Sequence, residues 1–306
     1  MTDYSSINAT QVDSFIPEIW LNEAITALRS YLNLAKTVRR DMDSAVARFG
    51  DTIKIPKTGA LSVNPKVTNT NVTRQAPADN EVSVVLNKHN EVTFLVEDVA
   101  RAQAYQDIRA LYIKDAVIAI AEELESDIAG EYVNAGDDVT FDDTSDATVE
   151  ASMLAIRKFF VDAKANKLDP KFLYGSSTLT NALLGTDKFT KVNEYGSRTP
   201  IVDGVLGDMF GINSFESQLV VSAGSPAVEH NLAYTRDAIC LVTRALPTDG
   251  NGEGVTQTSI TDPDSGVSMR LTSSYDANAL GRQVTLDILY GIKTVRPEFL
   301  LDVNLS

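Results

Sequence analysis

The sequence predicts an α+β fold organised around one long helix, with extended segments that cannot complete a core of their own. Apolar residues recur at helical spacing over residues 97–133, without Pro or Gly before Gly130. Short alternations of strand and turn follow, and residues 267–303 are rich in strand patterns. Residues 57–80 show no helical period and are long for a connection inside a compact domain.

The composition is that of an ordinary globular protein. Of 306 residues, 43% are hydrophobic and 23% are charged, and no apolar run approaches the length needed to span a bilayer. No signal-peptide pattern stands at the N-terminus, so folding in a cytoplasm is expected. The formal charge of −15 disfavours a sequence-reading DNA-binding protein, but it allows a protein that encloses DNA without gripping it.

Residues 15–49 are predicted to form a helical arm. Ser14 is a candidate N-cap and Gly50 ends the segment. The apolar residues recur every three or four positions, as on one side of a helix. The stripe consists of Trp20, Ala24, Ala27, Leu28, Tyr31 and Ala35.

An extended region follows the arm. Ile53 and Ile55 alternate before Pro56, which predicts a strand. Residues 81–87 and 91–96 also alternate, and we expect them to form a two-stranded ribbon with His89 in its solvated turn. Because an isolated ribbon is marginally stable in water, this region predicts a partner surface.

The helix predicted over residues 97–133 would be on the order of 50 Å long. Its apolar residues follow spacings of 4, 3, 4 and 4, but the charged heptad pattern of a coiled coil is missing. We therefore expect it to be the spine of an elongated protein. The stripe consists of Ile113, Val117, Ile120, Leu124 and Ile128.

A compact α/β region is expected after the spine. It begins with a second helix at about residues 147–164 and continues with strands at 172–174, 212–215 and 238–244. The glycine-rich stretch 250–254 is a flexible break before the C-terminal strands.

No motif supports an enzyme, a cofactor or a metal site. His89 and His230 lack the partners of a zinc site, and phosphate-loop, dinucleotide-binding and nucleophile-elbow motifs are missing. Cys240 lies in an apolar run, where a small buried residue is expected. The aspartates of residues 137–143 could bind calcium, but the EF-hand pattern is missing and a solvated loop is preferred.

Charge is distributed unevenly. Residues 122–150 contain eleven acidic and no basic residues, whereas residues 29–57 carry a net charge of +4. One hypothesis places the basic end of the arm on the acidic spine end of a neighbouring copy, and the alternative, that both stretches are solvated faces, stays open. The candidates for inter-subunit contact are Trp20, Tyr31, Arg39, Arg40, Lys57, Glu122 and Glu123.

The order of these parts resembles the HK97-like major capsid proteins of tailed bacteriophages. Gly50–Pro56 resembles the start of the family's extended loop (the E-loop), and Phe94–Val99 resembles the entry into its spine helix. Thr235–Pro247 is similar to the strand that leaves the family's axial domain. Asp262–Leu271 and Leu289–Glu298 resemble the closing strands of its peripheral domain. The resemblance covers essentially the whole chain, but it rests on the order of segments rather than on an invariant motif.

The resemblance implies four parts. Residues 1–50 would be the N-arm and 51–96 the E-loop, while 97–147 with 255–306 would form the peripheral domain and 148–254 the compact axial domain. Arm and loop would lie on neighbouring subunits in hexamers and pentamers of an icosahedral shell that encloses double-stranded DNA. The protein would be a component of the virion, assembled in the host cytoplasm.

Further partners are implied by the same resemblance. Some family members begin with an N-terminal scaffolding segment that a protease removes. Because the arm helix begins near residue 15 here, a separate scaffolding protein, or a cleavage outside this sequence, is expected. A portal and a decoration protein are further candidate partners. Some family members join a loop lysine to a neighbour's asparagine, for which Lys57, Lys66 and Lys88 with Asn304 are candidates. Two other functions remain open: the shell of an encapsulin-type nanocompartment, which would enclose cargo proteins, and a soluble enzyme with an unrecognised site.

Overall fold

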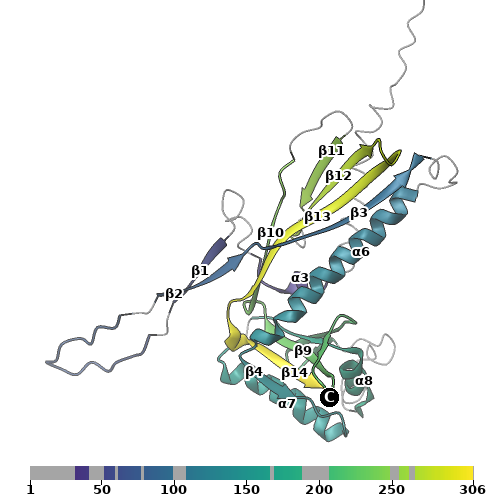
Figure 1. Cartoon of the computed structure of the whole chain (residues 1–306). Helices are drawn as coiled ribbons and strands as arrows, with labels where there is room; N and C mark the ends of the chain where they lie inside the picture. Colours follow the sequence, from purple (N-terminus) through teal and green to yellow (C-terminus); the bar gives the residue numbers. More distant parts are fainter. Residues whose placement is uncertain are drawn as a thin grey trace, which may run out of the picture.

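The computed structural model describes residues 32–40, 52–58, 61–76, 79–98, 108–165, 169–187, 207–248, 255–261 and 266–305. These residues form an elongated part, a compact part and a projecting ribbon (Figure 1). The elongated part is a five-stranded sheet with helix α6 (Ile108–Ala129) along one face. The compact part is a seven-stranded sheet with helices α7 (Asp146–Asp162) and α8 (Ser177–Gly185). The ribbon is the two-stranded sheet of β1 (Thr52–Thr58) and β2 (Asp79–Val85).

The elongated sheet is antiparallel. Its long central strand pairs with β3 on one side and with β12 and then β10 on the other. Val284, Leu286 and Ile288 of that strand are fully buried in one core with the apolar stripe of α6. The strands are β3 (Lys88–Glu97), β10 (Ile239–Arg244), β11 (Val255–Thr261), β12 (Ser268–Asp276) and β13 (Gly281–Thr294).

The compact sheet is mixed, with parallel pairing of β4 to β14 and of β5 to β7. Its order is β4-β14-β9-β5-β7-β6, and β8 pairs with β9. The strands are β4 (Asp137–Thr140), β5 (Lys171–Gly175), β6 (Gly207–Met209), β7 (Ile212–Glu216), β8 (Val221–Ala223), β9 (Val228–Thr235) and β14 (Leu300–Leu305).

Side chains alternate between the two faces of the compact sheet, so the sheet contributes to two apolar cores. Leu173 and Ala233 are buried against the apolar faces of α7 and α8. Their neighbours Tyr174, Leu232 and Tyr234 point the other way, into the core that contains α6. Successive side chains of a strand lie on opposite faces, so one sheet supports both layers. The compact part is therefore anchored to the elongated part through apolar packing.

Helix α7 confirms the second predicted helix, with bounds of 146–162 rather than 147–164. Ser145 caps its N-terminus, where the Oγ atom accepts a hydrogen bond from the Thr148 N–H. Met153, Ile156 and Phe160 lie on its buried face. The strands predicted near residues 172, 212 and 238 are also present, and the predicted strands over 284–295 form one strand, β13.

The long helix ends earlier than predicted, and its predicted range begins one residue too early, since Asp98 is helical; residues 99–107 lie outside the described residues. All five residues of the predicted apolar stripe are buried, which confirms the helical face. Glu97, however, belongs to β3, and Gly130–Asn134 form a 3-10 turn, η1. Helix α6 has 22 residues, which corresponds to about 33 Å. Glu97 pairs with Gly281 of β13 as part of a strand, so Glu97 is not part of the helix.

The predicted ribbon over residues 81–96 is wrong in its pairing. Strand β2 pairs with β1, from Thr52 opposite Val85 to Thr58 opposite Asp79. Strand β3 pairs instead with β13, so it has a partner within the chain. His89 accordingly lies within β3 rather than in a turn. A two-residue period identifies a strand but does not identify its partner.

The predicted continuous helix over residues 15–49 is wrong in its described part. Helix α3 (Leu34–Thr37) has four residues, and Val38 is extended. Arg39 then forms an isolated bridge to Cys240 of β10. Trp20 and Tyr31 lie outside the described residues.

The division into N-arm, E-loop, peripheral domain and axial domain stays a prediction. Strand β10, from the predicted axial segment, pairs with β13 of the elongated sheet. Strand β14, from the predicted peripheral segment, pairs with β9 of the compact sheet. Among the described helices, none is long and apolar enough to cross a membrane.

Candidate assembly surfaces

The loop between β1 and β2 projects away from the rest of the molecule (Figure 1). All of residues 61–76 are exposed, and Val63 is 97% exposed. Among the described residues, the hydrogen bonds of the loop are internal: the Ser62 N–H donates to Gln75 Oε1 over 2.9 Å, and Lys66 donates to the carbonyls of Val67 and Thr70. The large exposed apolar residues of the loop are Leu61, Val63, Val67 and Val72.

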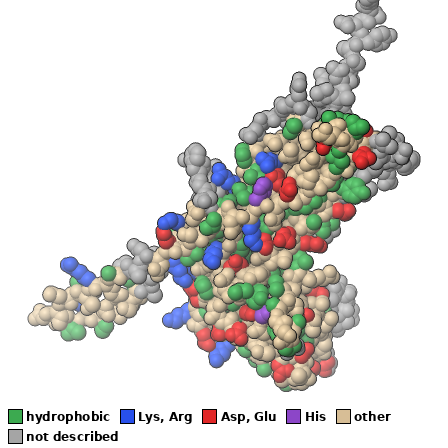
Figure 2. Space-filling model, viewed as in Figure 1, with side chains coloured by type: hydrophobic (Ala, Val, Ile, Leu, Met, Phe, Trp, Pro, Cys, Tyr) green, Lys and Arg blue, Asp and Glu red, His purple; other side chains and the backbone are tan. Residues whose placement is uncertain are grey.

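The loop is also basic. From Thr58 to Ala78 the sequence has Lys66 and Arg74 and no acidic residue. Figure 2 shows basic and hydrophobic side chains on the projecting loop and no acidic ones. Exposed apolar residues on a projection gain no burial within their own chain, so they are candidates for contact with another molecule.

The base of the ribbon is fixed to the body by apolar packing. Ile55 and Val84 of the ribbon are buried with Cys240, Val242 and Val295. Cys240 is therefore the buried apolar residue that its sequence context predicted. This packing holds the ribbon on the body while the loop beyond it stays exposed.

Lys57, a predicted contact residue, has a partner within the chain. Its Nζ atom lies 3.0 Å from Glu298 Oε2, and both side chains are partly exposed. Such a pair contributes on the order of 0–1 kcal/mol. Lys88 likewise lies 2.5 Å from Asp127 Oδ1. Lys57 of the ribbon and Lys88 of β3 are two of the candidates for a covalent bond to a neighbour. Both therefore form ion pairs within the subunit.

The described end of the arm is held by a buried acidic side chain, Glu125 of α6. The backbone N–H groups of Asn33, Leu34 and Ala35 donate to its two carboxylate oxygens over 2.9 to 3.1 Å. Burial raises the pKa of this carboxyl, and the three N–H groups and Lys36 lower it to a smaller extent. The carboxylate thus caps the start of α3 across 90 or more positions of sequence.

The arm end continues along β10. The Arg39 N–H donates to the Ile239 carbonyl and the Leu241 N–H donates to the Arg39 carbonyl, both over 3.0 Å. Arg39 and Arg40 are half-buried. The backbone around Arg39 is therefore docked on its own subunit, whereas the charge hypothesis placed this basic end on a neighbour. That inter-subunit contact stays a prediction.

The acidic stretch of residues 122–150 has two kinds of member. Asp127 accepts a hydrogen bond of 2.5 Å from the Tyr290 hydroxyl, and Glu131 accepts from the backbone and side chain of Thr294. Glu122 and Glu123 are exposed on α6. Part of the stretch therefore stabilises the subunit, which the sequence did not indicate because the donors lie more than 160 positions away.

An open groove lies between β3 and α6. Glu91 and Glu123 stand on its rim, and Val92 and Ala119 provide apolar lining. Of the predicted contact residues, Glu123 is the one that lines this groove. Its acidic character makes it a candidate surface for a basic segment of another molecule.

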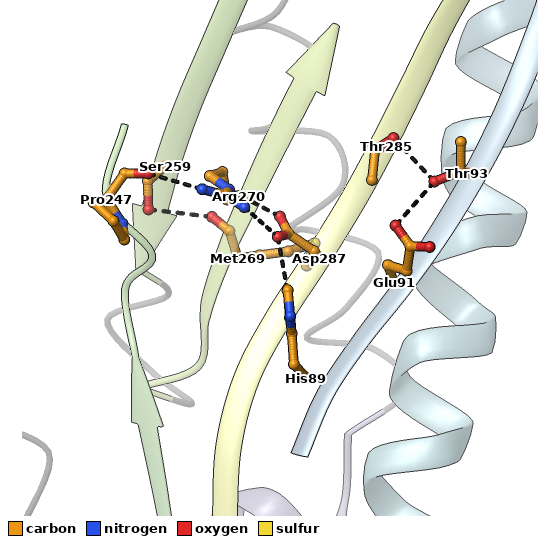
Figure 3. Close-up of polar contacts among 9 residues, drawn as sticks. All are labelled: His89, Glu91, Thr93, Pro247, Ser259, Met269, Arg270, Thr285 and Asp287. Atoms are coloured by element: carbon orange, nitrogen blue, oxygen red, sulfur yellow. Dashed lines mark hydrogen bonds and ion pairs between the residues drawn. The ribbon is translucent and has the colours of Figure 1, made fainter. Parts of the chain in front are cut away.

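A polar cluster crosses the sheet face opposite α6 (Figure 3). Asp287 is almost fully buried and accepts two hydrogen bonds from Arg270, over 3.1 Å to Oδ1 and 2.6 Å to Oδ2. His89 Nε2 lies 3.0 Å from the same carboxylate, and Arg270 also donates to the Pro247 carbonyl. No local sequence pattern predicted this cluster, because its members lie on three different strands.

A second histidine–aspartate pair lies where η1 meets the compact sheet. His230 Nδ1 is 2.8 Å from Asp302 Oδ2, and Tyr132 stacks on the His230 ring at 4.0 Å. Burial raises the pKa of Asp302, and His230 lowers it to a smaller extent. Both His–Asp pairs bridge neighbouring strands of a sheet, so their geometry fits a structural role.

No protein-family model matches the chain. No curated protein matches its sequence. Solved structures match its fold over most of their length. A chain from Mycobacterium phage Che8 matches with a TM-score of 0.64 and 18% identity, covering 88% of this chain and 89% of that chain. The capsid of cyanophage P-SCSP1u matches with a TM-score of 0.64 and 13% identity, covering 89% and 86%.

A virus-like particle from Pyrococcus furiosus matches with a TM-score of 0.54 and 10% identity, covering 93% of this chain and 98% of that chain. Such low identities establish the fold without establishing a shared function. The likeness nevertheless covers most of this chain in each comparison. The chain has the HK97-like α+β fold of phage capsid structures.

Proposed function

We propose that the chain is a major capsid protein, which assembles into an icosahedral shell around the double-stranded DNA of a tailed phage. The observation that carries this proposal is the loop of residues 61–76, which exposes four large apolar residues on a projection without burying them in its own subunit. A soluble monomer gains nothing from such a surface, whereas a shell subunit buries it on its neighbour. The structural likeness to phage capsids supports the same function.

The proposal includes hexamers and pentamers of this chain as the units of the shell. A scaffolding protein, a portal and a decoration protein are further partners, and the virion is the location, with assembly in the host cytoplasm. The net charge of −15 fits a shell that contains DNA by closure rather than by adhesion. The proposal requires no catalytic residue.

A nanocompartment shell of the encapsulin type is the second candidate. The specific observation in its favour is the match to the virus-like particle of Pyrococcus furiosus, which extends over nearly all of both chains. The match has a lower TM-score than those to Mycobacterium phage Che8 and cyanophage P-SCSP1u. A small tailless particle filled with protein would favour this candidate.

Replacing residues 61–76 by a short Gly-Ser turn tests the proposed role of the loop. The pairing of β1 with β2 and the packing of Ile55 and Val84 stay available, so the subunit is expected to fold. Sedimentation velocity is expected to show assembled particles for the wild type and free subunits for the variant. A matched point variant, Val63→Ser with Val67→Ser and Val72→Ser, keeps the length of the loop and is expected to weaken assembly. Normal shells from both variants would overturn the proposed role.

A further inference from the structure

The outer face of α7 exposes two large apolar residues. Leu154 is 41% exposed and Val161 is 63% exposed. They stand seven residues apart, which places them on the same side of the helix two turns from one another. The opposite side, with Met153, Ile156 and Phe160, already packs on the compact sheet. Figure 1 shows α7 on the outer side of the compact part, away from α6.

The N-terminal and C-terminal halves of this face of α7 carry opposite charges. Residues 137–150, at the N-terminal end, contain six acidic residues and no Lys or Arg. The C-terminal half of α7 carries Arg157 and Lys158, and Lys164 follows the helix, against one acidic residue, Asp162. Asp143, Asp146, Arg157 and Lys158 are all exposed. The face is therefore acidic at its N-terminal end, and its C-terminal half carries the basic pair Arg157 and Lys158 between the apolar residues Leu154 and Val161.

We propose that this face is a head-to-tail contact between copies of the chain, in which the acidic end of one α7 face meets the basic end of the next. A second copy is the partner because each end carries the charge that the other end attracts. A contact between two different patches of the same chain propagates, and it closes into a ring when the rotation allows. Leu154 and Val161, on either side of the basic pair, add apolar contact, and the charges set the direction of the contact.

This inference rests on the proposed shell function, but it concerns a surface separate from the projecting loop. In this contact, exposed acidic residues of the stretch 122–150 face the basic residues of a neighbouring α7. The charge hypothesis had placed them against the arm of a neighbour instead. The competing explanation is that the charges only complement the dipole of α7, since acidic groups at the N-terminus and basic groups at the C-terminus stabilise a helix. The two explanations predict opposite results for a charge exchange.

Three variants of the full-length chain make the test. The first reverses the basic end with Arg157→Glu and Lys158→Glu, and the second reverses the acidic end with Asp143→Lys and Asp146→Lys. Each is expected to assemble about tenfold less than wild type, because like charges then face one another. The third combines all four substitutions and restores opposite charges at the contact. Its assembly is expected to recover, as is that of the first two variants when they are mixed.

The matched control reverses two exposed basic residues on the elongated part, with Lys114→Glu and Lys293→Glu, and is expected to assemble as wild type. A second pair of variants compares Val161→Ser, expected to weaken assembly, with Val133→Ser, which removes a 72% exposed valine outside the face. Circular dichroism and thermal unfolding of unassembled subunits identify any variant that fails to fold.

The outcomes separate the alternatives. If the charges serve only the dipole, the fourfold variant combines both unfavourable ends and is the least stable and least assembled of the three. That result, or equal assembly of all charge variants with wild type, overturns the inference while leaving the shell function intact. A wild-type chain that stays monomeric at every concentration overturns both. Recovery in the fourfold variant or in the mixture supports the head-to-tail contact.

Discussion

Gly291 lies directly against the backbone of Val85: a Cβ atom built on the glycine would be 2.2 Å from the Val85 carbonyl oxygen. Gly291 belongs to β13 and Val85 ends β2, so this approach is where the projecting ribbon meets the body. A side chain at residue 291 has no space unless the end of β2 moves. The position of the ribbon therefore depends on the absence of one Cβ atom.

Substitution Gly291→Val is expected to displace the ribbon and to lower the free energy of unfolding by about 1–3 kcal/mol, the usual cost of overpacking. Hydrogen exchange should increase in β1 and β2 more than in the compact sheet. Gly130→Ala is the control, because a Cβ atom there would meet nothing within 4 Å. Unchanged exchange in the ribbon of the Gly291 variant would show that the contact does not position it.

Glu125 is expected to be essential for docking of the described arm end. Glu125→Ala leaves the buried N–H groups of Leu34 and Ala35 without their acceptor and should lower the free energy of unfolding by about 3 kcal/mol. Chemical denaturation measures this loss. Glu122→Gln, on the exposed side of the same helix, is the control and should have no measurable effect.

The raised pKa of the Glu125 carboxyl predicts the direction in which stability changes with pH. Its pKa is raised in the folded state by burial, so the folded protein binds this proton more tightly than the unfolded chain does. Its contribution to stability is fully present below the unfolded value and is lost as the pH rises through the folded value. The stability of wild type relative to Glu125→Gln should therefore decrease as the pH rises above the ordinary pKa range of a glutamic acid. A relative stability that increases over the same rise in pH would contradict the assignment.

Asp287 and Arg270 are expected to stabilise the elongated sheet as a pair. Asp287→Ala removes the carboxylate that accepts two hydrogen bonds from the mostly buried Arg270 guanidinium. The substitution should lower the free energy of unfolding by about 3 kcal/mol. A double-mutant cycle with Arg270→Ala isolates the interaction, for which we expect a coupling energy of about 1–3 kcal/mol. Glu91→Gln on the same face is the control. Strict additivity of the two substitutions would show that the pair contributes no coupling.

Much of the fold follows from local patterns in the sequence. The stripe from Ile113 to Ile128 identified α6, and the run before Lys164 identified α7, because each helix buries one face and the period is visible in the sequence. The expected order of extended segment, long helix and compact region is present. The predicted helix wrongly included Glu97, because this residue pairs across a sheet with Gly281, a contact that no local pattern encodes.

The candidate surfaces were less predictable than the fold. Two predicted contact residues, Glu122 and Glu123, are exposed, but Lys57 pairs with Glu298 of its own chain. The role of Glu125 depends on backbone groups 90 or more positions away, which a reading of charge along the sequence cannot reveal. The projecting loop was recognised as unusual, but its pairing of β1 with β2 needed the three-dimensional structure.

Purified subunits should not retain DNA. A chain of net charge −15 lacks the clustered basic contacts that survive screening, so filter binding at about 150 mM salt should give negligible retention. A sample at low salt serves as the comparison. Tight binding that decreases steeply with salt would contradict containment by closure.

Negative-stain electron microscopy of the purified full-length chain at micromolar concentration tests the central claim most directly. The account predicts closed shells built from rings of subunits, formed because the loop surface of each copy is buried on another. A field of uniform monomers at every concentration and salt condition would contradict it.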